Sequence, residues 1–527
     1  MSDRVVSAVR SKSSVVASAT ALVALAACGP EQEPTAGAPM PATTSEAAAA
    51  AAATITPDDL YQKISVLAAD SMRGRDTPSP EIEQVATWIG EHFASLGLRP
   101  GGDDGSFIQR YALRQMTASV ESSSIAFSNG ASLAWGTDVM ALGLPRDGST
   151  SGPVVLVSGS GDPAGAFADL PDQAQVFVFA GPEMEATRQT AWAGLASALY
   201  DAGAGQVFVI STIAGTPWER SLARSQQGSR VVGELDPDRP VTMNVREGAV
   251  RAALAGVDVD ALQSRQDDDL EVTVLEGLTV DSDIAIQILD DASAPNVVGI
   301  LEGSDPALRD EYIVYSAHMD HVGVGRTVQG GDSIFNGADD DASGTATIME
   351  VAEAMASLDR APRRSMIFLL VSGEEKGLLG SAYFADHPSV PVEQMVANIN
   401  ADMVGRNWPD TIVAIGKEHS DLGETLNRVN EAHPEIGMTA IDDLWPDERF
   451  YFRSDHFNFA RKGVPILFFF NGTHEDYHRA SDELDKIDTE KTARIGQLIF
   501  YLGLEVSETD ARPQWNPDSY AEIVEGA

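Results

Sequence analysis

The fold of the second half of this chain is constrained most strongly by short apolar runs that alternate with a segment of helical pattern. Strands are predicted at 312–317, 365–373, 397–403 and 464–470, and the segment 342–358 has apolar residues at helical spacing. Strands that are apolar on both faces and alternate with helices are typical of a parallel sheet covered on both sides. The sequence therefore predicts an α/β fold with a mixed, mostly parallel central sheet flanked by helices on both faces.

The first 27 residues are typical of a signal peptide. A basic segment precedes an apolar stretch at 15–27, whose thirteen residues are too few to span a bilayer. The stretch ends in Leu-Ala-Ala-Cys, which resembles a bacterial lipoprotein signal, and Cys28 is the only cysteine of the chain. The expectation is export with a lipid anchor at Cys28, in a bacterial membrane facing the periplasm or exterior. The alternative is plain secretion, because Ala24-Leu25-Ala26 also fits a small-x-small cleavage site.

Composition divides the remainder of the chain. Residues 28–56 are rich in Pro, Ala, Thr and Glu, which predicts a flexible tether. The segment 57–132 reads as an N-terminal part of the main domain, and 281–508 as the rest of it. Between them, 133–280 has short β-rich runs around one helical stretch, which predicts a small inserted α/β or β-rich domain with a structural or substrate-gating role. Residues 509–527 form a C-terminal tail.

The charge of the chain limits its partners. The formal net charge is −43 over 527 residues. Phosphate backbones and anionic membrane surfaces repel such a protein, so nucleic acid is not an expected partner.

Acidic and imidazole side chains follow the predicted strands. Since strands of an open α/β sheet present their carboxyl ends at one edge, side chains from separate segments are expected to meet there. These side chains are His318, Asp320 and His321, then the triplet Asp339 to Asp341, then Glu374 and Glu375, then Asp402, and last His474, Tyr477 and His478.

Imidazole and carboxylate groups without cysteine suit Zn²⁺ or a similar divalent ion. Two ions ~3.5–4 Å apart need a bridging carboxylate and further ligands on each side, and this set can supply them. Asp320 could orient His318 as a supporting partner. A calcium loop starting at Asp339 is disfavoured, because its fifth position is Ser343 and a helical pattern begins at once. His321 and His474 are interpreted as structural, and Ser454 as outside the core site.

Five ordered motifs resemble one known family. They are AHMDH, NGADDDASG, SGEEKGLLGS, NADMVGR and YHRASDELDKID. This series is similar to that of the co-catalytic di-zinc aminopeptidases, whose relatives include glutamate carboxypeptidases, glutaminyl cyclases and the transferrin receptor ectodomain. The resemblance covers residues of about 57–130 and 290–508, and the segment between them looks like a protease-associated domain.

The resemblance implies two zinc ions per chain and a role for each matching residue. His318 and Asp402 would bind one ion, Glu375 and His478 the other, and Asp340 would bridge both. Asp320 would support His318, Glu374 would be the general base, and Tyr477 would donate to the developing oxyanion.

The resulting expectation is a zinc-dependent exopeptidase acting on peptides. The leading form is an aminopeptidase that removes N-terminal residues with a metal-bridging water and a glutamate base. A glutaminyl cyclase uses the same fold, and a carboxypeptidase would need basic residues near the pocket. A receptor-like binding protein without activity is the remaining alternative, and the intact ligand positions argue against it.

Overall fold

A computed structural model describes residues 45–526 with short gaps. Predictions on residues 1–44, which include the signal peptide, Cys28 and the first part of the tether, lie outside the described residues. Among the helices described, none combines the length and apolar character needed to cross a membrane. The gaps are at 142, 160–164, 180–187, 213, 234–236, 238, 264–269 and 330.

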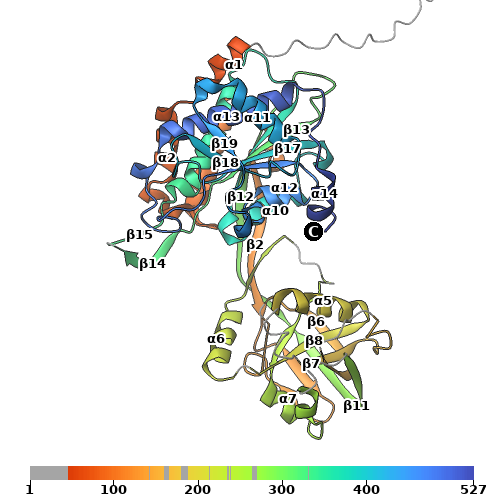
Figure 1. Cartoon of the computed structure of the whole chain (residues 1–527). Helices are drawn as coiled ribbons and strands as arrows, with labels where there is room; N and C mark the ends of the chain where they lie inside the picture. The colour runs from red at the N-terminus through yellow and green to blue at the C-terminus, as the bar shows by residue number, and fades with distance from the viewer. Residues whose placement is uncertain are drawn as a thin grey trace, which may run out of the picture. The chain divides into compact units, whose positions relative to one another are not determined.

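A ten-stranded sheet forms the main domain, in the order β19-β18-β20-β17-β13-β16-β12-β2-β9 with β1 on β12 (Figure 1). The four central strands β16, β13, β17 and β20 run parallel to one another, and β12 and β18 flank them antiparallel. The α/β class is thus confirmed, with parallel pairing at the centre of the sheet. The bounds are β1 Arg99–Pro100, β2 Ile108–Ala118, β9 Ser229–Val232, β12 Ile286–Leu301, β13 Tyr312–His318, β16 Ser365–Val371, β17 Met395–Ala401, β18 Thr411–Ile415, β19 Thr439–Ile441 and β20 Ile466–Phe470.

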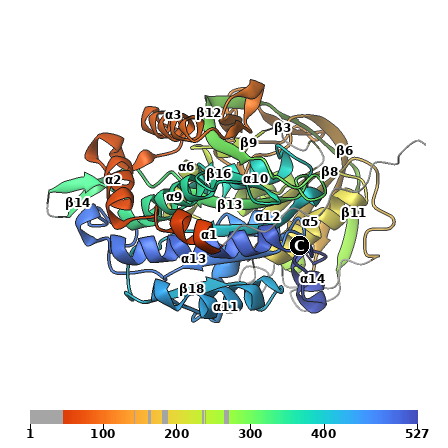
Figure 2. The same ribbon diagram turned by 90° about the horizontal axis from the view of Figure 1, so that it is seen from above.

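Successive side chains of the central strands pack into two hydrophobic layers, one on each face of the sheet. In β16, Met366, Phe368 and Leu370 pack with one set of helices, whereas Ile367, Leu369 and Val371 pack with the other. This is the two-residue period of a strand that is buried on both faces. Figure 2 looks down on the first layer, where α1 (Ser45–Ala52), α9 and α13 lie together. The first layer holds α2 Pro57–Leu67, α3 Pro80–Ser95, α9 Gly344–Ala356, α11 Leu422–Ala432 and α13 Thr489–Glu508, and the second holds α10 Leu379–Asp386 and α12 His456–Ala460.

The predicted tether is wrong for residues 45–56. These residues form helix α1 (Ser45–Ala52) and a short connection, and Ala48, Ala51 and Ala52 are buried in the first hydrophobic layer. Helix α2 then begins at a cap, where Thr56 accepts a hydrogen bond from the Asp59 N–H and Pro57 occupies the first helical position. The poly-Ala segment folds because α13 and α9 offer it an apolar surface, which composition alone does not reveal.

The C-terminal segment is also part of the folded body. Helix α14 (Pro517–Ile523) buries Ile523 in the second hydrophobic layer. The guanidinium of Arg364, which is fully buried, donates to the backbone carbonyls of Val506, Thr509 and Asp510. The tail therefore packs against the main domain.

A second, eight-stranded sheet is inserted between β2 and β12, in the order β4-β3-β11-β6-β7-β8-β10-β5. Four of its strands are β4 Ser132–Leu133, β5 Val139–Ala141, β6 Gly148–Ser158 and β10 Met243–Arg246. The predicted boundary at residue 133 cuts through this sheet, because β3 (Ser124–Phe127) pairs with β11 (Glu271–Ile284). Helix α5 (Arg188–Asp201) connects β7 (Ala174–Phe179) to the parallel strand β8 (Ala204–Ser211), as a crossover does.

Candidate metal centre

The carboxyl ends of the central parallel strands bring the predicted site residues together. Each strand places its ligand at the same edge because neighbouring strands run in the same direction. His318 ends β13, Glu374 and Glu375 follow β16, Asp402 follows β17, His478 lies in the loop after β20, and Asp340 lies in the turn before α9.

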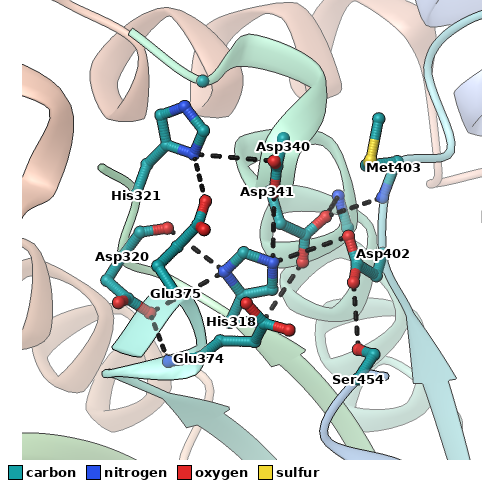
Figure 3. Close-up of polar contacts among 12 residues, drawn as sticks. His318, Asp320, His321, Asp340, Asp341, Glu374, Glu375, Asp402, Met403 and Ser454 are labelled. Atoms are coloured by element: carbon teal, nitrogen blue, oxygen red, sulfur yellow. Dashed lines mark hydrogen bonds and ion pairs between the residues drawn. The ribbon is translucent and has the colours of Figure 1, made fainter. Parts of the chain in front are cut away.

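One group of ligands gathers around His318 (Figure 3). Its Nε2 atom lies 3.3 Å from Asp340 Oδ1 and 3.5 Å from Asp402 Oδ1. All three side chains are buried, and together they could hold a metal ion. The Ser454 hydroxyl donates to the other oxygen of Asp402 at 2.9 Å, which leaves Asp402 Oδ1 turned toward His318.

A second group gathers around Glu375. Nε2 of His478 lies 3.1 Å from Glu375 Oε2 and 3.2 Å from Asp340 Oδ2. Nδ1 of His321 lies 2.7 Å from Glu375 Oε1. Asp340 therefore presents Oδ1 to the first group and Oδ2 to the second, which is the arrangement of a bridging carboxylate.

Buried ligand atoms without hydrogen-bond partners test whether the residues fit a metal. Asp340 Oδ2 and Asp402 Oδ1 are buried and lack a hydrogen-bond partner among the described residues. Each such atom costs on the order of 1–3 kcal/mol, which a bound cation would offset. Ligands of a tetrahedral zinc ion with bonds of ~2.0–2.1 Å lie about 3.3 Å from one another. The separations of 3.1–3.5 Å in the two groups fit that value.

The charges of the site depend on one another. Burial would raise the pKa of Asp340, but the imidazoles of His321, His318 and His478 hold it well below its usual range. Burial opposes the charged form of His478, yet contact with Asp340 and Glu375 raises its pKa to about 10. The carboxylates of Asp340 and Glu375 are therefore stabilised in their charged form by positive charge next to them.

The balance between burial and neighbouring charges is different at Glu374. Burial raises the pKa of this carboxyl well above the usual range, and Asp455 and Asp402 raise it further against the lowering effect of His318. A raised pKa suits a group that accepts and returns a proton.

The aspartates on either side of Asp340 bind backbone. Asp341 accepts hydrogen bonds from the N–H groups of His318, Gly344 and Met403, at 3.2, 2.9 and 3.1 Å. Asp339 accepts from the Gly405 N–H at 2.6 Å. The two flanking aspartates therefore tie the turn to the loops that carry His318 and Asp402, and Asp340 alone faces both ligand groups.

Asp320 lies between His318 and the Glu374 backbone. Its carboxylate accepts from the Glu374 N–H at 3.2 Å and lies 3.7 Å from Nδ1 of His318. The backbone oxygen of Asp320 is closer to that Nδ1, at 3.2 Å. Asp320 thus contacts His318 mainly through its carbonyl and fixes the position of Glu374 through its carboxylate.

A narrow cavity of about 40 Å³ opens beside the ligands. Its apolar wall consists of Met403, Phe450, Phe468 and Phe470, and Tyr477 lines it next to the metal ligands. A wider cavity of about 340 Å³ shares Phe450 and Tyr477 with it. An apolar group can therefore enter beside the metal centre while the rest of a ligand extends outward.

Sequence reasoning gave no role in the site to several residues that contact the ligand loops. His321 was interpreted as structural, but it contacts Glu375 within the metal centre. His474 lies 3.2 Å from Asp339 and outside both ligand groups. Asp482 accepts from the Asp339 and Asp340 N–H groups, and its place in the last motif was the available signal.

No pattern in the sequence indicated the role of Arg75, so sequence reasoning missed this residue. Its buried guanidinium donates to the carbonyls of Met319, Leu67, Asn336 and Gly337, at 2.6–2.9 Å. It thereby joins the loop after His318 to the turn before Asp340.

The fold and the ligand groups define an α/β protein with a metal centre of imidazole and carboxylate ligands. Residues 296–503 match the family described as Peptidase family M28.

The chain is also similar to individual proteins. The chain is 24% identical over 350 residues to aminopeptidase YwaD of Bacillus subtilis, which covers 61% of this chain and 69% of that protein. It is 28% identical over 261 residues to a probable zinc metalloprotease of Leptosphaeria maculans, covering 42% of this chain and 58% of the relative. Among solved structures, an aminopeptidase from Aneurinibacillus sp. strain AM-1 aligns with a TM-score of 0.46 at 18% identity, covering 88% of this chain and 96% of that one.

Proposed function

We propose that this protein is a zinc-dependent aminopeptidase that removes N-terminal residues from peptides with two zinc ions bridged by Asp340. The observation that carries the proposal is the placement of the two Asp340 oxygens, at 3.3 Å from His318 and 3.2 Å from His478. The family match supports a peptidase, and the names of the relatives support zinc and an aminopeptidase.

The bound ions would supply an activated water and polarise the scissile carbonyl. His318 and Asp402 would hold one ion, Glu375 and His478 the other. Glu374 is placed to accept the proton of the attacking water and to return it to the leaving amine. Tyr477 lines the same cavity and its ring stacks on His478 with centroids 3.9 Å apart, so its hydroxyl is a candidate donor to the oxyanion.

A carboxypeptidase would need a cation that binds the substrate's free carboxylate. Arg453 lines both cavities, but its guanidinium lies over the Phe450 ring at 4.7 Å and within 3.7 Å of Glu448. The Arg453 guanidinium thus already has an aromatic and an anionic neighbour, which argues against a role in binding the substrate's carboxylate. The aminopeptidase therefore remains the better-supported function.

The direct test compares three substrates with and without chelator. The purified protein should hydrolyse an amino-acid p-nitroanilide, lose this activity in EDTA and regain it with added zinc. It should leave an N-acetylated analogue intact and should not cyclise a glutaminyl peptide. Cyclisation without p-nitroanilide hydrolysis would replace the proposal with a glutaminyl cyclase.

We also propose that the chain is exported and lipid-anchored through Cys28, on the strength of the Leu-Ala-Ala-Cys signal. Expressed in a bacterium, the wild-type chain should sediment with membranes, and Cys28→Ser should appear in the soluble fraction. A wild-type chain that is fully soluble after processing would contradict the anchor.

We propose further that the inserted module is protease-associated-like and takes no part in the chemistry. Both metal-binding groups found among the described residues lie in the main domain. The Ser119 N–H donates to the Ala285 carbonyl at 2.7 Å, so a two-residue Asn-Gly turn can replace 120–284 and rejoin β2 to β12. This deletion also removes β9 (Ser229–Val232), the edge strand that pairs with β2 in the main sheet. The shortened protein should still bind zinc and hydrolyse a p-nitroanilide. A folded, zinc-loaded but inactive product would show that the insert completes the site.

A further inference from the structure

His321 is the imidazole of the metal centre that the proposed ligand set does not use. Its side chain is fully buried. Its backbone N–H donates to the Arg75 carbonyl at 3.3 Å. A Cβ added at Gly337, which has a φ of +56°, would lie 2.5 Å from Cγ of His321, so the ring packs directly against this glycine. The backbone and the packing together fix the His321 ring in place.

The fixed ring faces one oxygen of Glu375. Nδ1 of His321 lies 2.7 Å from Glu375 Oε1, whereas Nε2 of His478 lies 3.1 Å from Glu375 Oε2. Figure 3 shows His321 approaching Glu375 and Asp340 from the side opposite to His318. Glu375 is therefore contacted by two imidazoles, one at each oxygen.

The two distances indicate different roles. A separation of 3.1 Å is close to the ~3.3 Å expected between two ligands of one tetrahedral zinc ion. A separation of 2.7 Å is shorter than that value and is that of an ion pair in direct contact, although neither His321 Nδ1 nor Glu375 Oε1 has a hydrogen-bond partner among the described residues. From His321 Nδ1 to Asp340 Oδ2 the distance is 3.7 Å, so the ring is nearer to Glu375 than to the bridge.

We propose that His321 is a positioning residue for Glu375, holding Oε1 so that Oε2 faces the ion bound by His478. This inference rests on the proposed metal site. Outer partners of this kind orient a ligating carboxylate, and their loss weakens metal binding by roughly 10–100-fold. His321 thus sets the affinity of the Glu375–His478 ion without binding that ion.

Two substitutions at His321 separate positioning from direct ligation. The contact is made through Nδ1, and the side-chain amide of asparagine places an N–H donor near that atom. His321→Asn should keep the contact with Glu375, and His321→Ala should lose it. Zinc is titrated into the metal-free full-length protein by calorimetry, so the two binding steps are read without any activity assay.

The expected result is a second zinc ion bound roughly 10–100-fold more weakly by His321→Ala, with the first ion unchanged and His321→Asn close to the wild type. His474→Gln is the matched control, because this imidazole contacts Asp339 at 3.2 Å and lies outside the ligand groups. It should bind both ions like the wild type.

Two results would overturn the inference. If His321→Ala binds both ions as the wild type does, His321 has no role in positioning Glu375. If Asn and Ala both abolish the second ion, and zinc X-ray absorption of the wild type counts three imidazoles over the two ions, His321 is a ligand. Thermal unfolding of the metal-free variants identifies any that fail to fold. A wild type that binds zinc in this pattern but cleaves no peptide would refute the proposed function and leave the inference standing.

Discussion

Replacing Asp482 with asparagine tests how the turn that carries the bridging aspartate is held. The Asp482 carboxylate accepts from the Asp339 N–H at 3.0 and 3.2 Å and from the Asp340 N–H at 3.2 Å. It is fully buried, and it lies in the loop that follows His478. Asparagine keeps the shape but turns an NH₂ group toward one of these donors. The change should therefore disturb the position of Asp340 without removing a ligand.

The size of the effect follows from the hydrogen bond that asparagine cannot accept. One hydrogen bond to a charged group contributes ~1.5–3 kcal/mol, and ~1.4 kcal/mol corresponds to a tenfold change in a binding constant. Asp482→Asn should therefore weaken zinc binding by about 10–100-fold. This range is also typical of an outer-shell partner.

Competition of the protein with a chromophoric zinc chelator measures this affinity. Asp485→Asn, an exposed position in the same loop, is the control and should bind zinc like the wild type. An Asp482→Asn protein with wild-type zinc affinity would refute the idea that this loop holds the bridging turn.

Three further substitutions follow from the same geometry. Glu374→Gln should keep its zinc content and lose roughly 10²–10⁴-fold in kcat on a p-nitroanilide, and an active variant would exclude it as the base. Tyr477→Phe should lower kcat by up to ~10²–10³-fold with little change in KM, whereas a pure KM effect would assign Tyr477 to substrate binding. Burial lowers the pKa of His456 to about 3, so the unfolded chain takes up that proton first as the pH falls. Below about pH 6.5 the wild type should lose up to ~1.4 kcal/mol of stability per pH unit relative to His456→Asn, as measured by urea unfolding. Parallel stability curves for the two proteins would contradict this.

The central sheet could be predicted because its signal is local. The runs ending at Ala317, Gly373, Met403 and Phe470 are apolar on both faces, and each is followed by acidic or imidazole residues. Their meeting at one edge follows from parallel pairing alone. The proposed ligands are brought together in the structure for this reason.

The aspartate triplet in NGADDDASG includes two residues whose partners could not be predicted from the local sequence. The resemblance to the di-zinc aminopeptidases indicated that Asp340 differs from its neighbours, and the structure gives the neighbours their partners. Asp341 binds the His318 and Met403 backbone, and Asp339 binds Gly405. These hydrogen bonds join segments far apart in the chain, so no pattern within the triplet could reveal them.

Other features depended on tertiary packing. Ala48 and Ala51 are buried because α13 and α9 lie beside them, although their composition is that of a tether. Arg75 contributes four donors to distant carbonyls from a segment without any metal-ligand pattern. His321 sits one residue after Asp320, and only the position of Glu375 distinguishes it from a structural histidine.

The zinc content of the wild type and of Asp340→Asn, measured together with p-nitroanilide turnover, tests the bridging role of Asp340 most directly. We expect two zinc ions per wild-type chain. Asp340→Asn should lose at least one ion together with most turnover, since a single carboxylate serves both ligand groups. An Asp340→Asn protein that keeps two ions and wild-type turnover would contradict a metal centre bridged by this residue.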